Sequence, residues 1–258
     1  MPVSTVRRAG RRAASLAGVV LLAACGGPAA SPGAGAQGDA TPSETPGTAP
    51  PPAPAVTQHA APGPPPAEPA PQPPSPDELA GLLSREVPER GAGATVVVPG
   101  SAPAPAGGTE HRVRVEVEGG LAVDGEAFAS FVLGTLNDKR SWAADGHTFS
   151  RTDGDADVIV VLASPETSAA MCRPLQTNGK LSCRKGPRAI ITHHRWVHGT
   201  EDYADDLTGY RQYVVNHEVG HYLGRGHVDC PAGGAPAPVM QQQTMDVDPC
   251  VPNPWPYP

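Results

Sequence analysis

Short runs in which hydrophobic and polar residues alternate predict a set of β-strands in the second half of the chain. Residues 111–118 place Val113, Val115 and Val117 on one face and charged side chains on the other, the two-residue period of a half-buried strand. Four other apolar segments are predicted to be strands: 94–98, 147–151, 157–163 and 188–194. The continuous apolar run in the third of them suits a sheet interior or a well-covered edge. Asn178-Gly179 predicts a hairpin turn.

A helical period predicts two substantial helices. Asp124 is a suitable N-cap for a helix over residues 125–137, whose packing stripe consists of Phe128, Phe131, Val132, Thr135 and Leu136. A second helix is expected to have Thr208 as its N-cap and to run to about Leu223. Apolar residues lie on both sides of this second helix, so it is predicted to be buried between two layers.

The first residues of the chain resemble an export signal. Residues 1–24 contain four arginines, then an apolar run from residue 16, and no acidic residue. The run is much shorter than the roughly 20 residues that a membrane-spanning helix needs. It ends in Leu-Ala-Ala-Cys, which looks like a bacterial lipobox, so we expect Cys25 to become a lipidated N-terminus. The alternative is an ordinary secretory signal followed by an incidental cysteine.

A proline-rich segment separates this signal from the folded part. Residues 26–76 hold 17 of the 33 prolines and no aromatic residue, so they cannot bury enough apolar surface to offset the entropy of ordering. We therefore interpret 25–76 as a disordered tether and 77–258 as one domain. The domain is expected to begin with a short helix over residues 77–86, capped by Ser75 or Asp77.

The charge of the chain argues against nucleic acid as a partner. The formal net charge is −7, and removal of the four signal-peptide arginines makes it −11. No basic stripe is left to neutralise phosphates. An acidic surface of this kind favours solubility and, among peptide substrates, cationic ones.

Five cysteines indicate an oxidising compartment. Assigning Cys25 to lipid leaves an even set, Cys172, Cys183, Cys230 and Cys250, which allows three disulfide pairings. We favour Cys172–Cys183 and Cys230–Cys250, because each pair encloses a short segment rich in turn residues. The alternative of a second metal site has no C-x-x-C spacing to support it.

The sequence HEVGHYLGRGH, residues 217–227, carries the candidate chemistry. Because residues four apart share one face of a helix, His217 and His221 can reach a single metal ion. Glu218 flanks that face and is close enough to act on a metal-bound water. Gly224 permits the positive φ that ends the helix and turns the chain, which brings His227 in as a third ligand. A fourth position is left open, as in catalytic zinc sites.

This H-E-x-x-H-x-x-G-x-x-H pattern resembles the signature of the metzincin zinc proteases. The exported part, from about residue 113 to 255, also resembles a family of secreted or lipid-anchored actinobacterial proteins that carry the signature. The resemblance implies an α+β fold with a twisted mixed sheet, two helices packed on it together with the zinc helix, and a small irregular C-terminal part. It also implies a methionine turn below the histidines, for which Met240 is the first choice and Met245 the second.

Other residues are weaker candidates. No tyrosine closely follows Met240, so the sequence names no second oxyanion donor, and Tyr203, Tyr210 and Tyr213 are weakly supported candidates. His193 and His194 are adjacent on a predicted strand and would face opposite ways, so both are interpreted as structural or surface residues. The metzincin resemblance implies an edge strand that binds peptide substrate, either residues 157–163 or the hairpin beside them.

The leading hypothesis is a monomeric, extracytoplasmic zinc endopeptidase, attached to the membrane only through the lipid on Cys25. One Zn²⁺ would activate water, Glu218 would act as general base, and the substrate would be a protein or peptide of the cell envelope. The alternatives are a zinc amidase acting on peptidoglycan peptides and a zinc-containing lipoprotein that binds partners without cleaving them. The intact Glu218 speaks against the last of these.

Overall fold

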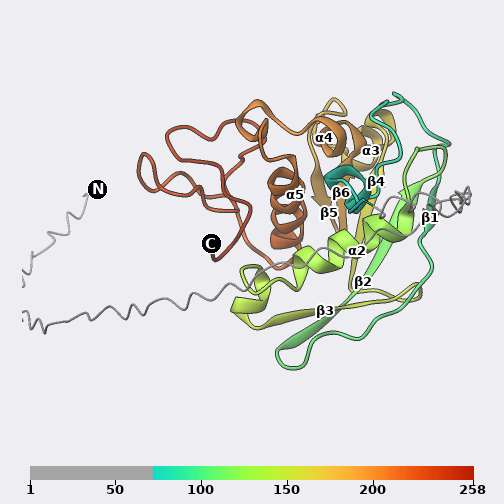
Figure 1. Ribbon diagram of the computed structural model, residues 1–258, viewed down its shortest axis with the longest axis horizontal. Coiled ribbons are helices and arrows are strands. Elements are labelled where there is room, and N and C mark those ends of the chain that lie inside the picture. Colours follow the sequence, from blue (N-terminus) through green and yellow to red (C-terminus); the bar gives the residue numbers. More distant parts are fainter. Residues whose placement is uncertain (1–71) are drawn as a thin grey trace, which may run out of the picture. The chain divides into compact units, whose positions relative to one another are not determined.

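A mixed β-sheet forms the centre of the region that the computed structural model describes, residues 72–258 (Figure 1). Its strand order is β1-β2-β4-β6-β5, and β3 pairs with the first half of β2. The central strands β2, β4 and β6 are parallel, whereas β1 and β5 are antiparallel edge strands. The strands are β1 (Thr95–Val97), β2 (Thr109–Glu118), β3 (His147–Arg151), β4 (Val158–Ala163), β5 (Cys183–Lys185) and β6 (Arg188–Thr192). The expected α+β class with a mixed sheet is confirmed.

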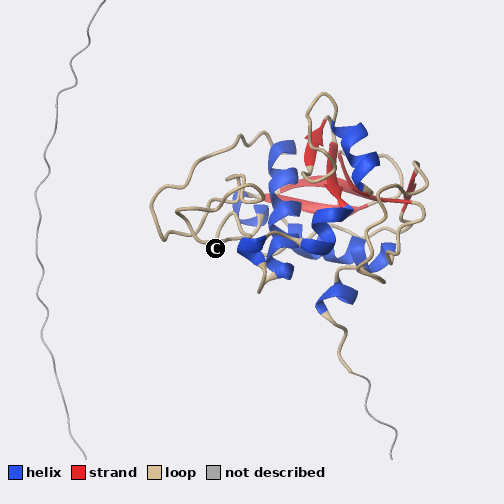
Figure 2. Cartoon of the chain, turned by 90° about the horizontal axis from the view of Figure 1, so that it is seen from above, coloured by secondary structure: helices blue, strands red, loops and turns tan. Residues whose placement is uncertain are grey.

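Five helices surround this sheet within the described residues (Figure 2). They are α1 (Pro76–Leu79), α2 (Gly125–Leu136), α3 (Pro165–Cys172), α4 (His193–His198) and α5 (Leu207–Tyr222), with 3₁₀ turns η1 (Trp142–Asp145) and η2 (Glu201–Tyr203). Helices α2 and α5 share the larger hydrophobic core with one face of the sheet, and α3 covers the other face. After α5, the chain continues to its end without further helix or strand (Figure 1).

Strand β4 contributes side chains to both of these cores. Its residues Val158, Val160 and Leu162 belong to the core under α2 and α5, and the residues between them belong to the core under α3. All six residues are therefore buried, which explains the unbroken apolar run. Because β4 lies between β2 and β6, it is an interior strand and cannot be the peptide-binding edge. The hairpin proposed as the alternative edge, around Asn178-Gly179, does not form either, but β5 is an edge strand next to that turn.

The prediction that β2 is half-buried is wrong for its second half. Glu116 and Glu118 lie on the face opposite the valines, yet they are only 3% and 1% exposed. Glu118 accepts hydrogen bonds from the backbone N–H groups of Gly93 and Ser164 and from the Thr167 hydroxyl, at 2.7–2.8 Å. Burial raises the pKa of Glu118, but these donors together lower it by more than burial raises it. The pKa of Glu118 is therefore below its usual value.

Both favoured disulfides are present, Cys172–Cys183 and Cys230–Cys250. The first connects the last residue of α3 to β5, so the predicted hairpin between those cysteines is wrong. Asn178 and Gly179 do form a turn, with φ of 51° and 69°, but no strand precedes it. The two disulfides agree with an extracytoplasmic location.

Several predicted boundaries change because distant contacts override local pattern. The first helix ends at Leu79 rather than residue 86, and it includes Pro76, which we had assigned to the tether. Helix α5 is capped by Asp206, whose carboxylate accepts from the Gly209 N–H at 2.8 Å, and not by Thr208.

The last predicted strand ends earlier than expected. Strand β6 stops at Thr192, so His193 and His194 begin helix α4 instead of extending the strand. Helix formation places the Trp196 indole edge-on against Phe128 of α2. This packing also makes His193 fully buried.

Two predictions fall on residues that the structure does not describe. The signal peptide at 1–24 and the lipidation of Cys25 lie outside the described residues, as does almost all of the proposed tether. In the part that is described, no helix is both long and apolar enough to cross a bilayer.

We predict that Glu118→Gln lowers the free energy of unfolding by about 1–3 kcal/mol at neutral pH, because the amide leaves a buried donor unpaired. The folded-state pKa of Glu118 is depressed, so its contribution is complete above the unfolded pKa and disappears as pH falls through the folded pKa. In urea unfolding experiments, the difference in free energy of unfolding between wild type and variant should therefore become smaller below about pH 4. The control is Glu110→Gln, at the exposed start of the same strand. A difference that does not change with pH would contradict this role for Glu118.

Candidate metal centre

Helix α5 fixes the first two histidines of the candidate site. All residues of this helix from 209 to 220 except Gln212 are buried, because the sheet and α2 lie on one side of it and the C-terminal segment, residues 226–258, lies on the other (Figure 1). His217 and His221 are one helical turn apart, and their ring centroids are 4.7 Å apart. The tight packing of the helix therefore fixes the direction of both imidazoles.

The third histidine is brought back by the turn that ends α5. Gly224 adopts a φ of 83°, and the N–H of Arg225 donates to the carbonyl of Gly220 at 2.9 Å, which is a Schellman motif. A side chain at position 224 would strain this conformation. The reversed chain places Nε2 of His227 3.0 Å from Nε2 of His221. One nitrogen from each of the three histidines lies within 4.8 Å of the others, so the predicted ligand set comes together.

The hydrogen bonds behind the rings make these nitrogens suitable for a cation. Nδ1 of His217 lies 2.8 Å from the Val239 carbonyl, and Nδ1 of His221 lies 2.9 Å from the Arg225 carbonyl. A carbonyl only accepts, so each ring carries its proton on Nδ1 and directs the Nε2 lone pair into the site. The close approach of the two Nε2 atoms of His221 and His227 is then stable only with a proton or a cation between them. The residues present thus fit a zinc ion, with three neutral imidazoles as ligands.

Glu218 lies beside this group with an unsatisfied oxygen. Its side chain is 4% exposed, and its Oε2 has no hydrogen-bond partner among residues 72–258. Burial raises the pKa of the Glu218 carboxyl to about 8, while the charge of Arg184 opposes that rise. A buried carboxylate oxygen without a donor is expensive, so this atom is expected to interact with a water or a bound group.

The turn over residues 238–241 packs against α5 and supports His217. Its 2.9 Å hydrogen bond joins the Gln241 N–H to the Pro238 carbonyl, and its Val239 carbonyl orients His217. Met240 is buried against α5, and a Cβ built on Gly220 would lie 2.5 Å from its sulfur. Met240 thus packs on the helix between the two helical histidines. Met245, the second choice, is 64% exposed and lies at the edge of the cavity.

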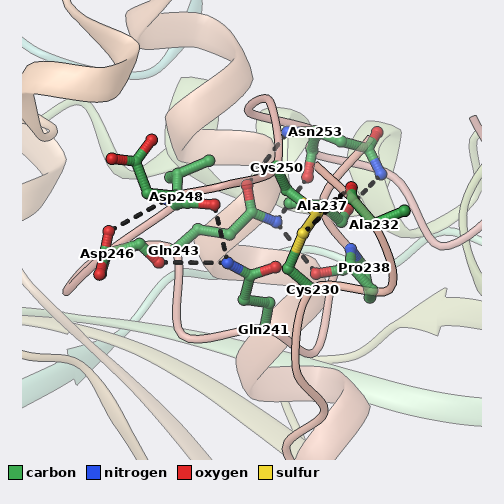
Figure 3. Close-up of a disulfide and its surroundings, with 11 residues drawn as sticks. Cys230, Ala232, Ala237, Pro238, Gln241, Gln243, Asp246, Asp248, Cys250 and Asn253 are labelled. Atoms are coloured by element: carbon green, nitrogen blue, oxygen red, sulfur yellow. Dashed lines mark hydrogen bonds between the residues drawn. A yellow bond between two sulfur atoms is a disulfide. The ribbon is translucent and has the colours of Figure 1, made fainter. Parts of the chain in front are cut away.

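Buried amide side chains hold this turn in place (Figure 3). The Gln243 side chain donates to the carbonyls of Pro238 and Asn253, and the Asn253 side chain donates to the Ala237 carbonyl. The Cys230–Cys250 disulfide closes the same segment. Sequence reasoning missed these amides, because nothing in a proline-rich tail distinguishes a buried glutamine from an exposed one.

The same network uses the tyrosines that we had considered as oxyanion donors. The hydroxyls of Tyr203 and Tyr213 donate to Gln243 Oε1 at 2.7 Å and to the Gln241 carbonyl at 3.1 Å. Tyr210 pairs with the Thr244 hydroxyl at 3.0 Å. All three are buried, and their hydroxyls connect the C-terminal segment to η2, which carries Tyr203, and to α5, which carries the other two.

The 3₁₀ turn η1 supports the other side of the site. Trp142 donates from its indole N–H to the Asn216 carbonyl at 3.1 Å, directly before His217. Asp145, at the end of η1, forms an ion pair with Arg225, whose carbonyl orients His221. This pair connects η1 to the turn that carries the third histidine, and sequence reasoning did not identify it.

The three histidines and Glu218 line a cavity of about 650 Å³. One wall is formed by residues 175–177 and 181–184, which include edge strand β5. The other wall includes Gln242, Thr244 and Met245 of the C-terminal segment. This space is large enough for several residues of a peptide.

The chain belongs to the family described as “Protein of unknown function (DUF3152)”, which it matches over residues 83–258. No curated protein and no solved structure matches it. The matched residues include the three histidines, Glu218 and both disulfides, so the whole candidate site lies inside the family domain.

We predict that Asp145→Asn weakens zinc binding by roughly 10- to 100-fold, because loss of the ion pair frees Arg225 and the carbonyl that orients His221. The measurement is competition with a chromogenic zinc chelator. Glu166→Gln is the matched control, since it removes an exposed ion pair with Arg90 on the other face of the sheet. Equal affinities of wild type and Asp145→Asn would show that the pair does not position the ligand.

Proposed function

We propose that this protein is a zinc-dependent endopeptidase of metzincin type that acts outside the cytoplasm. One observation carries the proposal: three imidazole nitrogens converge next to a buried carboxyl group with an unpartnered oxygen, in a peptide-sized cavity. A packing role would explain neither the paired backbone bonds behind His217 and His221 nor the unsatisfied Glu218 oxygen. His217, His221 and His227 would hold the ion.

When bound at such a site, zinc acts as a Lewis acid that lowers the pKa of water to about 7 and polarises a carbonyl. Glu218 would receive a proton on Oε2 and pass it to the leaving amine. The nearby cation would lower the high pKa that burial gives Glu218, which makes its carboxylate available as a base. The dry surroundings of the helix strengthen this electrostatic coupling.

Strand β5 is the feature that favours an extended peptide as substrate. It pairs only with β6 in the described region, so its second edge has free backbone groups. Residues 182–184 line the same cavity as Glu218. A peptide added to this edge would be positioned by main-chain hydrogen bonds with its scissile bond across the site. The site would hold the peptide and the reacting water together.

The location and the anchor belong to the same proposal. Two disulfides support an oxidising compartment, and the lipobox-like residues ending at Cys25 support attachment by lipid. Proteins of the cell envelope would then be within reach of the domain. This placement explains how an enzyme with no membrane-spanning helix among its described residues could act at the membrane surface.

We predict that the purified chain binds one zinc and hydrolyses casein or a quenched fluorescent peptide until a chelator is added. Glu218→Ala should retain the zinc and lose at least about 100-fold in kcat, because only the proton carrier is removed. Metal content by atomic emission and turnover of the same samples test both statements.

The control is Glu110→Gln, which leaves the cavity unchanged and should turn over normally. One zinc per chain without peptide cleavage would contradict the endopeptidase function. That result would favour the amidase, which is tested with muropeptides, or a binding role. A chain with no zinc would contradict the metal centre itself.

A further inference from the structure

One wall of the cavity belongs to a basic stretch of the chain. Residues 167–200, which include the loop before β5 and β5 itself, contain six lysines and arginines and no acidic residue. Residues 226–258, which form the C-terminal segment, contain three aspartates and no lysine or arginine. In a chain of net charge −7, such a basic stretch is a local feature that the overall charge conceals.

The basic wall presents its charges to solvent. Arg173, Lys180, Arg184 and Lys185 are exposed, and none of them forms an ion pair with a carboxylate of the described region. Arg188, by contrast, is engaged with the buried Glu116. Cations without a carboxylate partner are available to attract an anionic ligand.

Arg184 is the basic residue that lines the cavity itself. It lies on β5, and the only hydrogen bond of its side chain among the described residues is a 3.3 Å bond to the Gly186 carbonyl. Glu218 and the three histidines line the same cavity, so the charge of Arg184 acts within that space.

The opposite wall is neutral to acidic. Gln242, Thr244 and Met245 line the cavity there, and the exposed Asp246 follows directly. The C-terminal segment and β5 lie on the two sides of α5 (Figure 1). A bound peptide thus meets the positive charge of Arg184 on β5 and uncharged side chains on the side of Gln242, Thr244 and Met245.

We propose that the cavity takes an extended peptide whose acidic side chains lie along β5, next to Arg184. This inference rests on the proposed peptidase function and names its substrate class. It replaces the expectation from net charge, which favours cationic peptides. Screening limits electrostatic interactions to about 8 Å at physiological salt, so the side chains around the cavity decide the preference and the distant carboxylates do not.

The test uses two short fluorescent peptides that are identical except for glutamate or lysine on both sides of a central leucine. Binding is measured by anisotropy to the zinc-loaded full chain carrying Glu218→Ala, so that neither probe is cleaved. The acidic peptide should bind at least about tenfold more tightly at low salt, and less so at about 0.15 M salt. Arg184→Glu in the same background should abolish or reverse this preference.

Lys139→Glu is the matched control, because it makes the same charge change at an exposed lysine that does not line the cavity. It should leave the tenfold preference intact. Equal binding of both peptides, tighter binding of the lysine peptide, or no binding of either would overturn the inference. An unchanged preference in Arg184→Glu would overturn it as well.

Turnover by the wild-type chain separates this inference from the proposed function. Cleavage of both peptides at the same rate would retain the peptidase and overturn the acidic preference. Selective, Arg184-dependent binding without any cleavage would support the acidic ligand and contradict the peptidase.

Discussion

The hydrogen bond from His217 Nδ1 to the Val239 carbonyl is the interaction on which the candidate site depends. It crosses from helix α5 to a turn 22 residues further along the chain, so it forms only after both have reached their final places. The bond fixes the tautomer of the ring and aims its free nitrogen at the other two histidines. Without it, a buried neutral imidazole could present either nitrogen, and the three ligands would not share one centre.

That dependence explains why a tail without helix or strand needs so many specific contacts. The 238–241 turn must not move, and neither helix nor sheet hydrogen bonds hold it. Its support comes from buried side-chain amides, three tyrosine hydroxyls and a disulfide that closes the segment. A buried amide network is stabilising only when each member is satisfied, so it selects a single arrangement of the tail.

The parts of the site that could be predicted from sequence are those whose residues lie close together along the chain. His217, His221, Gly224 and His227 follow from helix geometry and from one glycine turn, both of which are local. The role of Met240 came from a family resemblance, and the structure places it under Gly220.

The features that escaped prediction all depend on distant partners. The burial of Glu116 and Glu118 is decided by segments that cover the second face of the sheet, far along the chain from β2. Helix α4 replaces the end of a strand because Trp196 packs on α2. The pairing of Asp145 with Arg225 joins residues 80 positions apart. No local pattern encodes such contacts.

Burial of α5 also decides how charge acts in the cavity. Glu218 is removed from water, so a nearby charge affects it more strongly than a charge of the same size would affect an exposed carboxylate. Two positive charges matter there: Arg184, whose influence is already present, and the cation that the histidines would hold. Burial raises the pKa of Glu218 to about 8 even with Arg184 nearby. A cation held by the three histidines, as proposed above, would favour the ionised form of the Glu218 carboxyl, because opposite charges attract strongly where water is excluded.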